Sequence, residues 1–284
     1  MATHLPVIGG HEEGFCKTKR TDSWWTGPAI TFFVFSLFVV YTTWAAFQGN
    51  HYYAEPYLSP FYSPVIHARD LGPDMQAYVT NGMVPPDHAL LGTFPSWWPG
   101  FIPMSPALLI LVFPGGFRFT CYYYRKAYYR SFAGSPPGCA VNPLATGRKY
   151  RGETALLFFQ NLHRYMLYFA LIFVVLLAKD AVEAFFKNGK FGVGVGSLIL
   201  TINVFLIASY TFGCHSFRHL IGGRKDTMSC GKSTATLGAW KKATWFNGRH
   251  MQFAWASLLW VMITDVYVRL VSMGVITDLN TWGS

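Results

Sequence analysis

Long apolar runs, separated by shorter polar and aromatic segments, dominate the chain. A helix needs about 20 apolar residues to cross the hydrocarbon layer of a membrane. Three runs reach this length cleanly, at 29–48, 155–178 and 251–273. A fourth, at 192–214, is rich in glycine at its start and apolar thereafter. The pattern predicts a transmembrane helix over each of these four runs.

A fifth apolar run, at 106–124, contains Pro114, Gly115 and Gly116. Proline lacks a backbone N–H and disturbs the preceding turn, so we expect a kinked span, tolerated because neighbouring helices can satisfy the freed carbonyl. The alternative is a re-entrant or interfacial segment. With this run included, the sequence predicts an all-α integral membrane protein with a five-transmembrane-helix bundle in residues 29–284, preceded by an N-terminal segment, 1–28.

Basic residues fall unevenly on the two sides of these five spans. Residues 1–28, about 118–154 and about 215–250 share one side, and they hold 17 of the 23 Lys and Arg residues. Positively charged segments remain in the cytoplasm. We therefore predict a cytoplasmic N-terminus, an extracytoplasmic C-terminus and a long extracytoplasmic loop at 49–102 that caps the outer helix ends.

The composition agrees with a membrane environment. Charged residues make up 13% of the chain, against about 25% in a typical soluble domain. The net charge of +10 lies in segments between apolar runs, so membrane topology explains it better than nucleic-acid binding does. Residues 1–27 lack the apolar core of a secretory signal, and five cysteines in so long a chain do not indicate a disulfide framework.

Cysteine and histidine gather at the predicted cytoplasmic ends of four spans. Ionisable residues within a membrane tend to mark functional sites, and thiolate with imidazole suits zinc, copper or iron–sulfur centres. The alternative is that these side chains only pack, as most membrane cysteines do. The candidate metal ligands are Cys121, Cys139, Cys214, His163, His215, His219 and His250.

The spacing of these candidates does not single out four ligands, because the chain has no CxxC motif. His215 and His219 share a helix face and can reach one metal, whereas Cys214 points away from them. We expect their helix to end at Gly222. Cys16 and Cys230 lie in polar or basic segments and rank below the seven candidates.

Five segments resemble the membrane anchor subunit of a succinate dehydrogenase (complex II) class first described in mycobacteria. They cover the second to fifth predicted spans, while the first span and the loop that follows it show no such likeness. The segments are Phe117–Arg130, Ser135–Val141, Gln160–Tyr165, Cys214–His219 and Asn247–Trp260.

The resemblance implies a bacterial inner-membrane subunit of succinate:quinone oxidoreductase with a single five-helix anchor and a membrane-embedded Rieske-type 2Fe–2S cluster. Two cysteines and two histidines among the seven candidates would hold the cluster. Flavoprotein and iron–sulfur subunits would dock on the cytoplasmic face, and the whole complex could form a higher oligomer. Electrons would pass from the iron–sulfur subunit through the cluster to a quinone, menaquinone or ubiquinone, and no residue of this chain would be catalytic.

Quinone carbonyls need hydrogen-bond donors, and polar side chains at the level of the candidate ligands can supply them. These quinone-binding candidates are Tyr123, Arg164, Tyr165, Ser216, Arg218, Trp245 and Arg249.

Three other functions stay open from the residues alone. One is a b-type cytochrome anchor with a single inner haem b, held by His163 with His219 or His250. The others are a purely structural anchor and a metal transporter. Because no predicted span carries histidine at its outer end, a second, outer haem is not expected.

Overall fold

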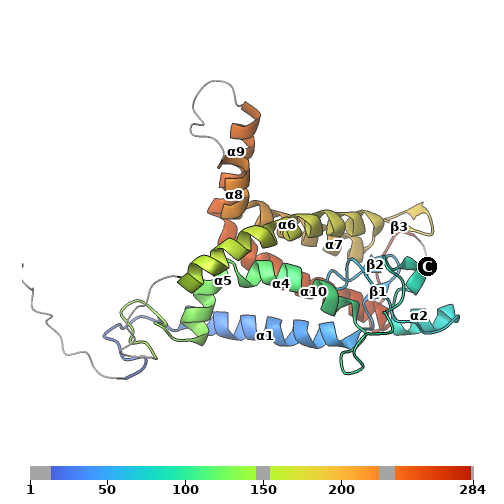
Figure 1. Cartoon of the computed structure of the whole chain (residues 1–284), viewed down its shortest axis with the longest axis horizontal. Helices are drawn as coiled ribbons and strands as arrows, with labels where there is room; N and C mark the ends of the chain where they lie inside the picture. The colour runs from blue at the N-terminus through green and yellow to red at the C-terminus, as the bar shows by residue number, and fades with distance from the viewer. Residues whose placement is uncertain (1–13, 145–153, 224–233, 283–284) are drawn as a thin grey trace, which may run out of the picture.

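The computed structural model describes residues 14–144, 154–223 and 234–282. Within these residues, four helices are long and apolar enough to cross a membrane. They are α1 (Thr26–Gln48), α6 (Thr154–Glu183), α7 (Val195–Phe212) and α10 (His250–Ser272). Their positions match the predicted spans at 29–48, 155–178, 192–214 and 251–273, and Figure 1 shows them arranged along one common direction.

The fifth predicted span, at 106–124, is broken into short helices. These are α3 (Pro106–Ile110), α4 (Val112–Phe119) and α5 (Tyr122–Ala127), after which the π-helix η2 covers Tyr128–Phe132. The first break lies at Leu111, because Pro114 has no N–H to donate to the carbonyl of Ile110. The segment therefore bends, as expected for a proline there, and its role as a fifth span stays a prediction.

Residues 49–105 fold over one end of the bundle, here named the cap end. They contain a hairpin of β1 (Tyr53–Ala54) and β2 (Tyr57–Leu58), the helix α2 (Met75–Asn81) and the 3-10 helix η1 (Pro86–His88). Tyr52 and Tyr62 stack with ring centroids 4.3 Å apart and pack, fully buried, with Ala45 of α1 and Val261 of α10. The segment is thus joined to the helices by a core of its own.

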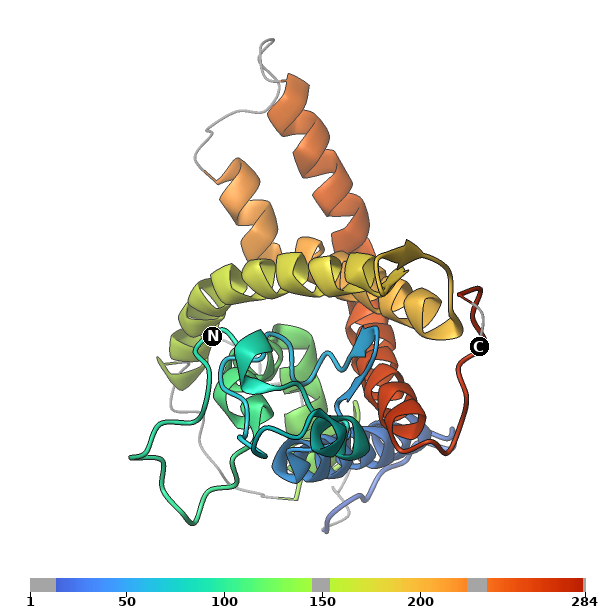
Figure 2. The same cartoon turned by 90° about the vertical axis from the view of Figure 1, so that its right-hand side faces the viewer.

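The opposite end of the bundle, here named the site end, carries α5 and two further helices. These are α8 (His215–Gly222) and α9 (Thr234–Gly248), which project away from the bundle in Figures 1 and 2. A hairpin of β3 (Phe186–Lys187) and β4 (Lys190–Phe191) joins α6 to α7 at the cap end.

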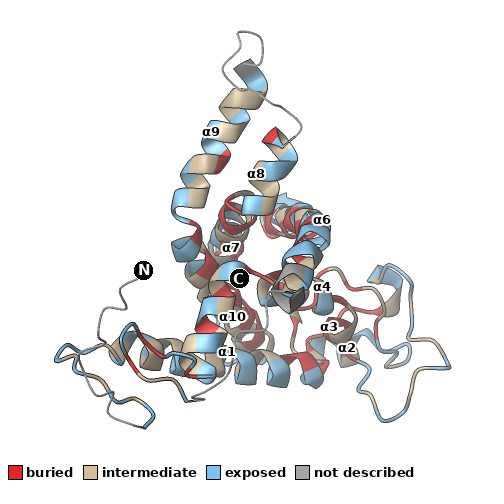
Figure 3. Ribbon diagram, turned by 60° about the vertical axis from the view of Figure 1, so that its left-hand side comes forward, coloured by how far each residue is buried: buried red, intermediate tan, exposed pale blue. Residues whose placement is uncertain are grey.

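Burial differs sharply between α1 and the other long helices. Figure 3 shows buried residues on the inward sides of α4, α6, α7 and α10. On α1, by contrast, large apolar side chains such as Phe33 and Val40 remain about two-thirds exposed (69% and 68%). Exposed apolar side chains on a helix of this length are typical of a lipid-facing surface.

A buried ion pair fixes α10 at the cap end. Arg269 Nε lies 3.4 Å from Asp265 Oδ2, one helical turn away, and both side chains are almost fully buried. Tyr41 of α1 donates a hydrogen bond of 2.5 Å to Asp265 Oδ2, and Ser59 of the cap donates to Oδ1. Arg269 also donates to the carbonyl oxygen of Asn50 at 3.0 Å. This network ties α10, α1 and the cap segment together.

Replacing Arg269 by methionine should destabilise the protein strongly, because Asp265 would then be a buried charge without its cation. Breaking a buried pair in this way costs about 3–5 kcal/mol. The matched control is Lys179→Met, which removes the cation of an i,i+4 pair with Glu183 (2.6 Å) whose side chains are both more than half exposed. Its cost should stay below about 1 kcal/mol. Thermal unfolding of the purified complex in detergent measures both, and equal shifts would contradict the structural role of Arg269.

Candidate metal centre

The break between α7 and α8 sets the position of Cys214. The sequence led us to expect one helix running to Gly222, but α7 ends at Phe212 and a second helix begins at His215. Cys214 is the extended N-cap residue between them, and its Sγ accepts a hydrogen bond from the backbone N–H of Ser216 (3.4 Å). The expectation of a continuous helix was therefore wrong, whereas the predicted stop at Gly222 is correct.

Gly213 makes this junction possible. A Cβ atom at Gly213 would lie 3.0 Å from His250 Nδ1 and from the backbone oxygens of Ser209 and Phe246. The carbonyl of Gly213 accepts a hydrogen bond from the amide of Asn247 (2.7 Å). The end of α7 therefore lies directly against the junction of α9 and α10, where His250 is the first residue of α10.

Cys121 lies at a second helix break. It is the extended residue between α4 and α5, with φ −67° and ψ 135°, nearly the same conformation as Cys214 (φ −66°, ψ 142°). His163 comes from the third turn of α6, inside a regular helix. Two cysteines at helix breaks thus meet two histidines held by long helices.

A cavity of about 470 Å³ opens among these elements. Six of the seven predicted metal ligands line this cavity. The prediction that several helices bring cysteine and histidine to one level is therefore confirmed for these six. The six are Cys121, His163, Cys214, His215, His219 and His250.

The six residues differ in depth. Cys121, His163, Cys214 and His250 are at most 8% exposed and form the inner part of the cavity. His215 and His219 are exposed and lie at its opening. Partial shielding of its ring from solvent, followed by the nearby Arg218 charge, lowers the pKa of His215 and favours its neutral imidazole.

His163 is held in a defined orientation. Its ring stacks on Phe117, with centroids 4.4 Å apart and planes 6° from parallel. Its Nδ1 lies 3.0 Å from the hydroxyl of Thr120, which donates its own proton to the carbonyl of Gly116 (2.8 Å). Thr120 therefore accepts from Nδ1–H, and the lone pair of Nε2 faces Cys214 Sγ, 3.1 Å away. A hydrogen bond of this kind to the other ring nitrogen is typical of metal-binding histidines.

His250 has a buried ring nitrogen without a partner. The ring stacks on Tyr210 at 4.9 Å, and Tyr123 meets it edge-on at 5.1 Å. Its Nδ1 has no hydrogen-bond partner among the described residues. Leaving such an atom unpaired costs free energy, so a bound group that uses it would be stabilising.

The structure places Cys139 outside this cavity. Cys139 is exposed and lies where residues 14–24 pack on the loop at 134–144. Its carbonyl accepts a hydrogen bond from Arg20 (2.9 Å), and the neighbouring Ala140 carbonyl accepts one from Thr18 (2.7 Å). Its predicted role as a ligand therefore has no support from its position, and Cys230 lies outside the described residues.

In the described part of the chain, no three His, Cys, Asp or Glu side chains are close enough together to hold one metal ion as they stand. The contact between His163 and Cys214 and the unpaired nitrogen of His250 remain the geometric signs of a binding site.

The predicted quinone-binding residues divide into two groups. Tyr123, Arg164 and Ser216 line the 470 Å³ cavity. Tyr165 and Trp245 are mainly exposed, and the guanidinium of Arg249 lies 4.1 Å above the Trp245 ring. Arg218 donates to Asn247 Oδ1 at 3.2 Å and lies over Trp240.

Sequence reasoning missed three residues that hold the cavity's histidines in place: Phe117, Thr120 and Tyr210. Each is an ordinary membrane residue by type, and only the contact with His163 or His250 reveals its role. The one available signal was sequence position, because Thr120 directly precedes Cys121.

The chain is similar to known succinate dehydrogenase subunits. The family model described as actinobacterial succinate dehydrogenase subunit SdhC matches residues 26–274. A chain in the solved structure of the Mycobacterium smegmatis Sdh1 complex in the apo form is 40% identical, with a TM-score of 0.78 and coverage of 94% of each chain. Comparison with curated protein sequences gives no match.

Replacing Gly213 by alanine should destabilise the helix junction, because two of the three atoms that its Cβ would meet are backbone oxygens with little freedom to move. Overpacking of this kind costs about 1–3 kcal/mol. The matched control is Gly238→Ala in α9, where a Cβ meets nothing within 4 Å and alanine should stabilise the helix by about 0.5–1 kcal/mol. Thermal unfolding of the complex distinguishes the two, and a neutral Gly213→Ala would show that the junction is looser than described.

Proposed function

The chain belongs to the family of actinobacterial succinate dehydrogenase subunit SdhC, and on this basis we propose that it carries electrons to a membrane quinone through a Rieske-type 2Fe–2S cluster in the Cys/His cavity. As a membrane anchor subunit of succinate dehydrogenase, it is a non-catalytic part of an enzyme complex in the bacterial inner membrane.

We assign the ligands to Cys121, Cys214, His163 and His250. These are the four most deeply buried of the seven candidates, and each comes from a different element. The observation that carries the assignment is the alignment of His163, whose Nδ1 is held by Thr120 while Nε2 faces Cys214 Sγ.

The donor set fits a Rieske-type cluster. Such a cluster takes two cysteines and two histidines, with the histidines replacing a cysteine pair on one of the two irons. When bound, it would accept and release single electrons at a higher potential than an all-cysteine cluster. The residues around it hold the histidines in place, since Phe117 and Tyr210 stack on His163 and His250.

Exposed basic residues at the site end favour docking of the partner subunits there. The exposed basic residues Lys241, Lys242 and Arg249 lie on or next to α9, which projects from the bundle. We propose that this face is cytoplasmic, as the distribution of Lys and Arg predicts. The flavoprotein and iron–sulfur subunits would then dock beside the cavity, where acidic surfaces could pair with these cations.

Replacing Cys121 or Cys214 by serine should abolish the Rieske-type electron paramagnetic resonance signal of the dithionite-reduced complex and lower its iron content by about two atoms, because a ligand of the 2Fe–2S cluster is lost while the iron–sulfur subunit keeps its own iron. His163→Ala and His250→Ala should do the same. Succinate oxidation by an artificial acceptor should persist in all four variants, since the flavin lies in another subunit.

Cys139→Ser is the matched control and should keep the signal, because Cys139 is exposed and remote from the cavity. A signal that survives in Cys214→Ser would rule out the ligand assignment. A sharp haem α band in the optical spectrum of the wild-type complex, without a Rieske signal, would instead establish the b-type cytochrome alternative.

A further inference from the structure

The last part of the cap segment, here named the apolar loop (residues 90–104), exposes large apolar side chains. Phe101 is 87% exposed and Trp97 75%, while Leu90 and Leu91 are 69% and 67% exposed. The loop contains no charged residue, and the next charge along the chain is Arg118. An exposed apolar patch of this kind marks a surface that contacts another protein or a membrane.

Two successive turns bring the aromatic side chains to the surface of the apolar loop. The backbone N–H groups of Trp98 and Ile102 each donate to the carbonyl of the proline three residues earlier, at 3.0 Å. Each turn thus reads proline, small residue, aromatic residue, apolar residue. In both turns the third residue, Trp97 or Phe101, is exposed, and the fourth is half-buried. The exposure of the two rings therefore follows from a repeated local structure.

Hydrogen bonds fix the backbone of the apolar loop to the rest of the cap. The N–H of Leu90 donates to the carbonyl of Val65 (2.9 Å), and the carbonyl of Gly92 accepts from the N–H of Ala68 (2.9 Å). Val65 and Ala68 are buried in the core that the cap forms with α1 and α10. The exposed rings are thus held in place relative to the helices.

The end of the apolar loop lies level with the last turn of α1. The hydroxyl of Ser105, directly after the loop, donates to the carbonyl of Ala46 (2.6 Å), and both residues are buried. With 23 residues, α1 is about 35 Å long and just crosses a hydrocarbon layer of about 30 Å. Its last turn therefore lies at the boundary between hydrocarbon and headgroups, where Trp and Tyr are enriched.

The exposed apolar surface continues from α1 into the loop. Trp44 and Phe47, near the end of α1, are about half exposed (46% and 52%), and the lipid-facing side chains of α1 precede them. Figure 2, in which the cap end faces the viewer, shows the loop projecting sideways from the helices. A surface that extends sideways from a lipid-facing helix at the level of its end meets lipid before it meets water.

We propose that the apolar loop is a lipid anchor, which inserts Trp97 and Phe101 into the bilayer between the headgroups and the acyl chains on the cap side. Because the loop is uncharged, its insertion depends on the burial of apolar area and not on anionic headgroups. The cap is bonded to α10 through Ser59 and Asp265, so the anchored loop also sets the depth of the bundle in the bilayer. It does so whether or not a cluster fills the Cys/His cavity.

Photochemical cross-linking identifies what covers the loop. Phe101 is replaced by photoreactive p-benzoylphenylalanine, which keeps an aromatic ring at an exposed position, and the intact complex is reconstituted into phosphatidylcholine vesicles and irradiated. Mass spectrometry should find phospholipid adducts at position 101. A second probe, at Trp97, should give the same adducts, since both side chains lie at the exposed position of their turns.

Two further probe positions serve as matched controls. Phe33 of α1 is 69% exposed on the lipid-facing helix and should give phospholipid adducts, which verifies the photochemistry. Val79 is similarly exposed (66%), but α2 extends beyond the end of α1 in Figure 1 and should face water. Adducts at position 101 should exceed those at position 79 by about tenfold or more, as the burial of one phenylalanine side chain in hydrocarbon predicts.

A protein adduct at position 101, or no phospholipid adduct there while position 33 gives one, would overturn the proposal. Equal yields at positions 101 and 79 would overturn it as well. High salt, or phosphatidylglycerol added to the vesicles, should leave the yield at position 101 unchanged, because no charge attracts the loop to the membrane. A yield that falls with salt would show that electrostatic attraction, and not apolar burial, holds the loop.

The Rieske-type signal of the same samples tests the proposed function separately. It should be equal in all probe variants, because the loop lies at the cap end and the Cys/His cavity at the site end. Its absence from the wild-type complex would count against the cluster and leave the adducts at position 101 as evidence for the anchor.

Discussion

In a membrane, a helix can stop only where other groups satisfy its free amides and carbonyls, and the candidate site depends on this constraint. At the Gly213–Cys214 break, the side-chain amide of Asn247 donates a hydrogen bond to the Gly213 carbonyl. Cys214 Sγ accepts one from the backbone N–H of Ser216 in α8. At the break before Cys121, the Gly116 carbonyl accepts hydrogen bonds from both the backbone N–H and the hydroxyl of Thr120. The residues that satisfy these ends therefore also fix the two thiols.

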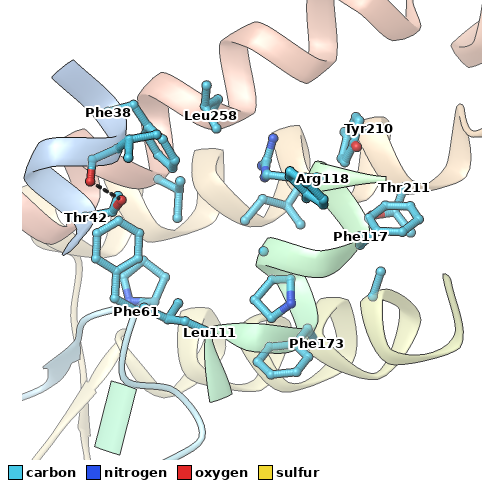
Figure 4. Close-up of a pocket in the computed structure, with 18 of the residues that line it drawn as sticks. Phe38, Thr42, Phe61, Leu111, Phe117, Arg118, Phe173, Tyr210, Thr211 and Leu258 are labelled. Atoms are coloured by element: carbon cyan, nitrogen blue, oxygen red, sulfur yellow. Dashed lines mark hydrogen bonds between the residues drawn. The ribbon is translucent and has the colours of Figure 1, made fainter. Parts of the chain in front are cut away.

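The Cys/His cavity and an apolar cavity of about 550 Å³ (Figure 4) differ in chemistry, and no residue lines both. One contains soft ligands and several polar side chains, while the other is apolar apart from a few donors at its inner edge. Tyr210 lines the apolar cavity, and its ring contacts both His250 (4.9 Å between centroids) and the guanidinium of Arg118 (4.8 Å).

The sequence alone was enough to predict the features that follow from the order of apolar and polar residues along the chain. Apolar runs located the four long helices, and Pro114 predicted the bend in the segment at 106–124. The gathering of Cys and His at one level also followed from depth along each run. The separation of the buried Cys121 from the exposed Cys139 did not, because it depends on how the segments around each cysteine pack in the folded chain. The stacking of Phe117 on His163 and of Tyr210 on His250 depends on contacts between distant segments, which spacing along one helix cannot reveal.

The position of His250 depends on interactions at the far end of the same helix. His250 begins α10, and Asp265 lies fifteen residues further on, about 22 Å away along the axis. Asp265 is held by Tyr41, Ser59 and Arg269, which prevents α10 from sliding or turning against α1 and the cap. Because a regular helix transmits such a constraint along its length, the buried ion pair at the cap end also sets the depth of the imidazole at the site end. Burying the Asp265–Arg269 pair costs free energy, but the pair also fixes the position of His250, which it does not contact.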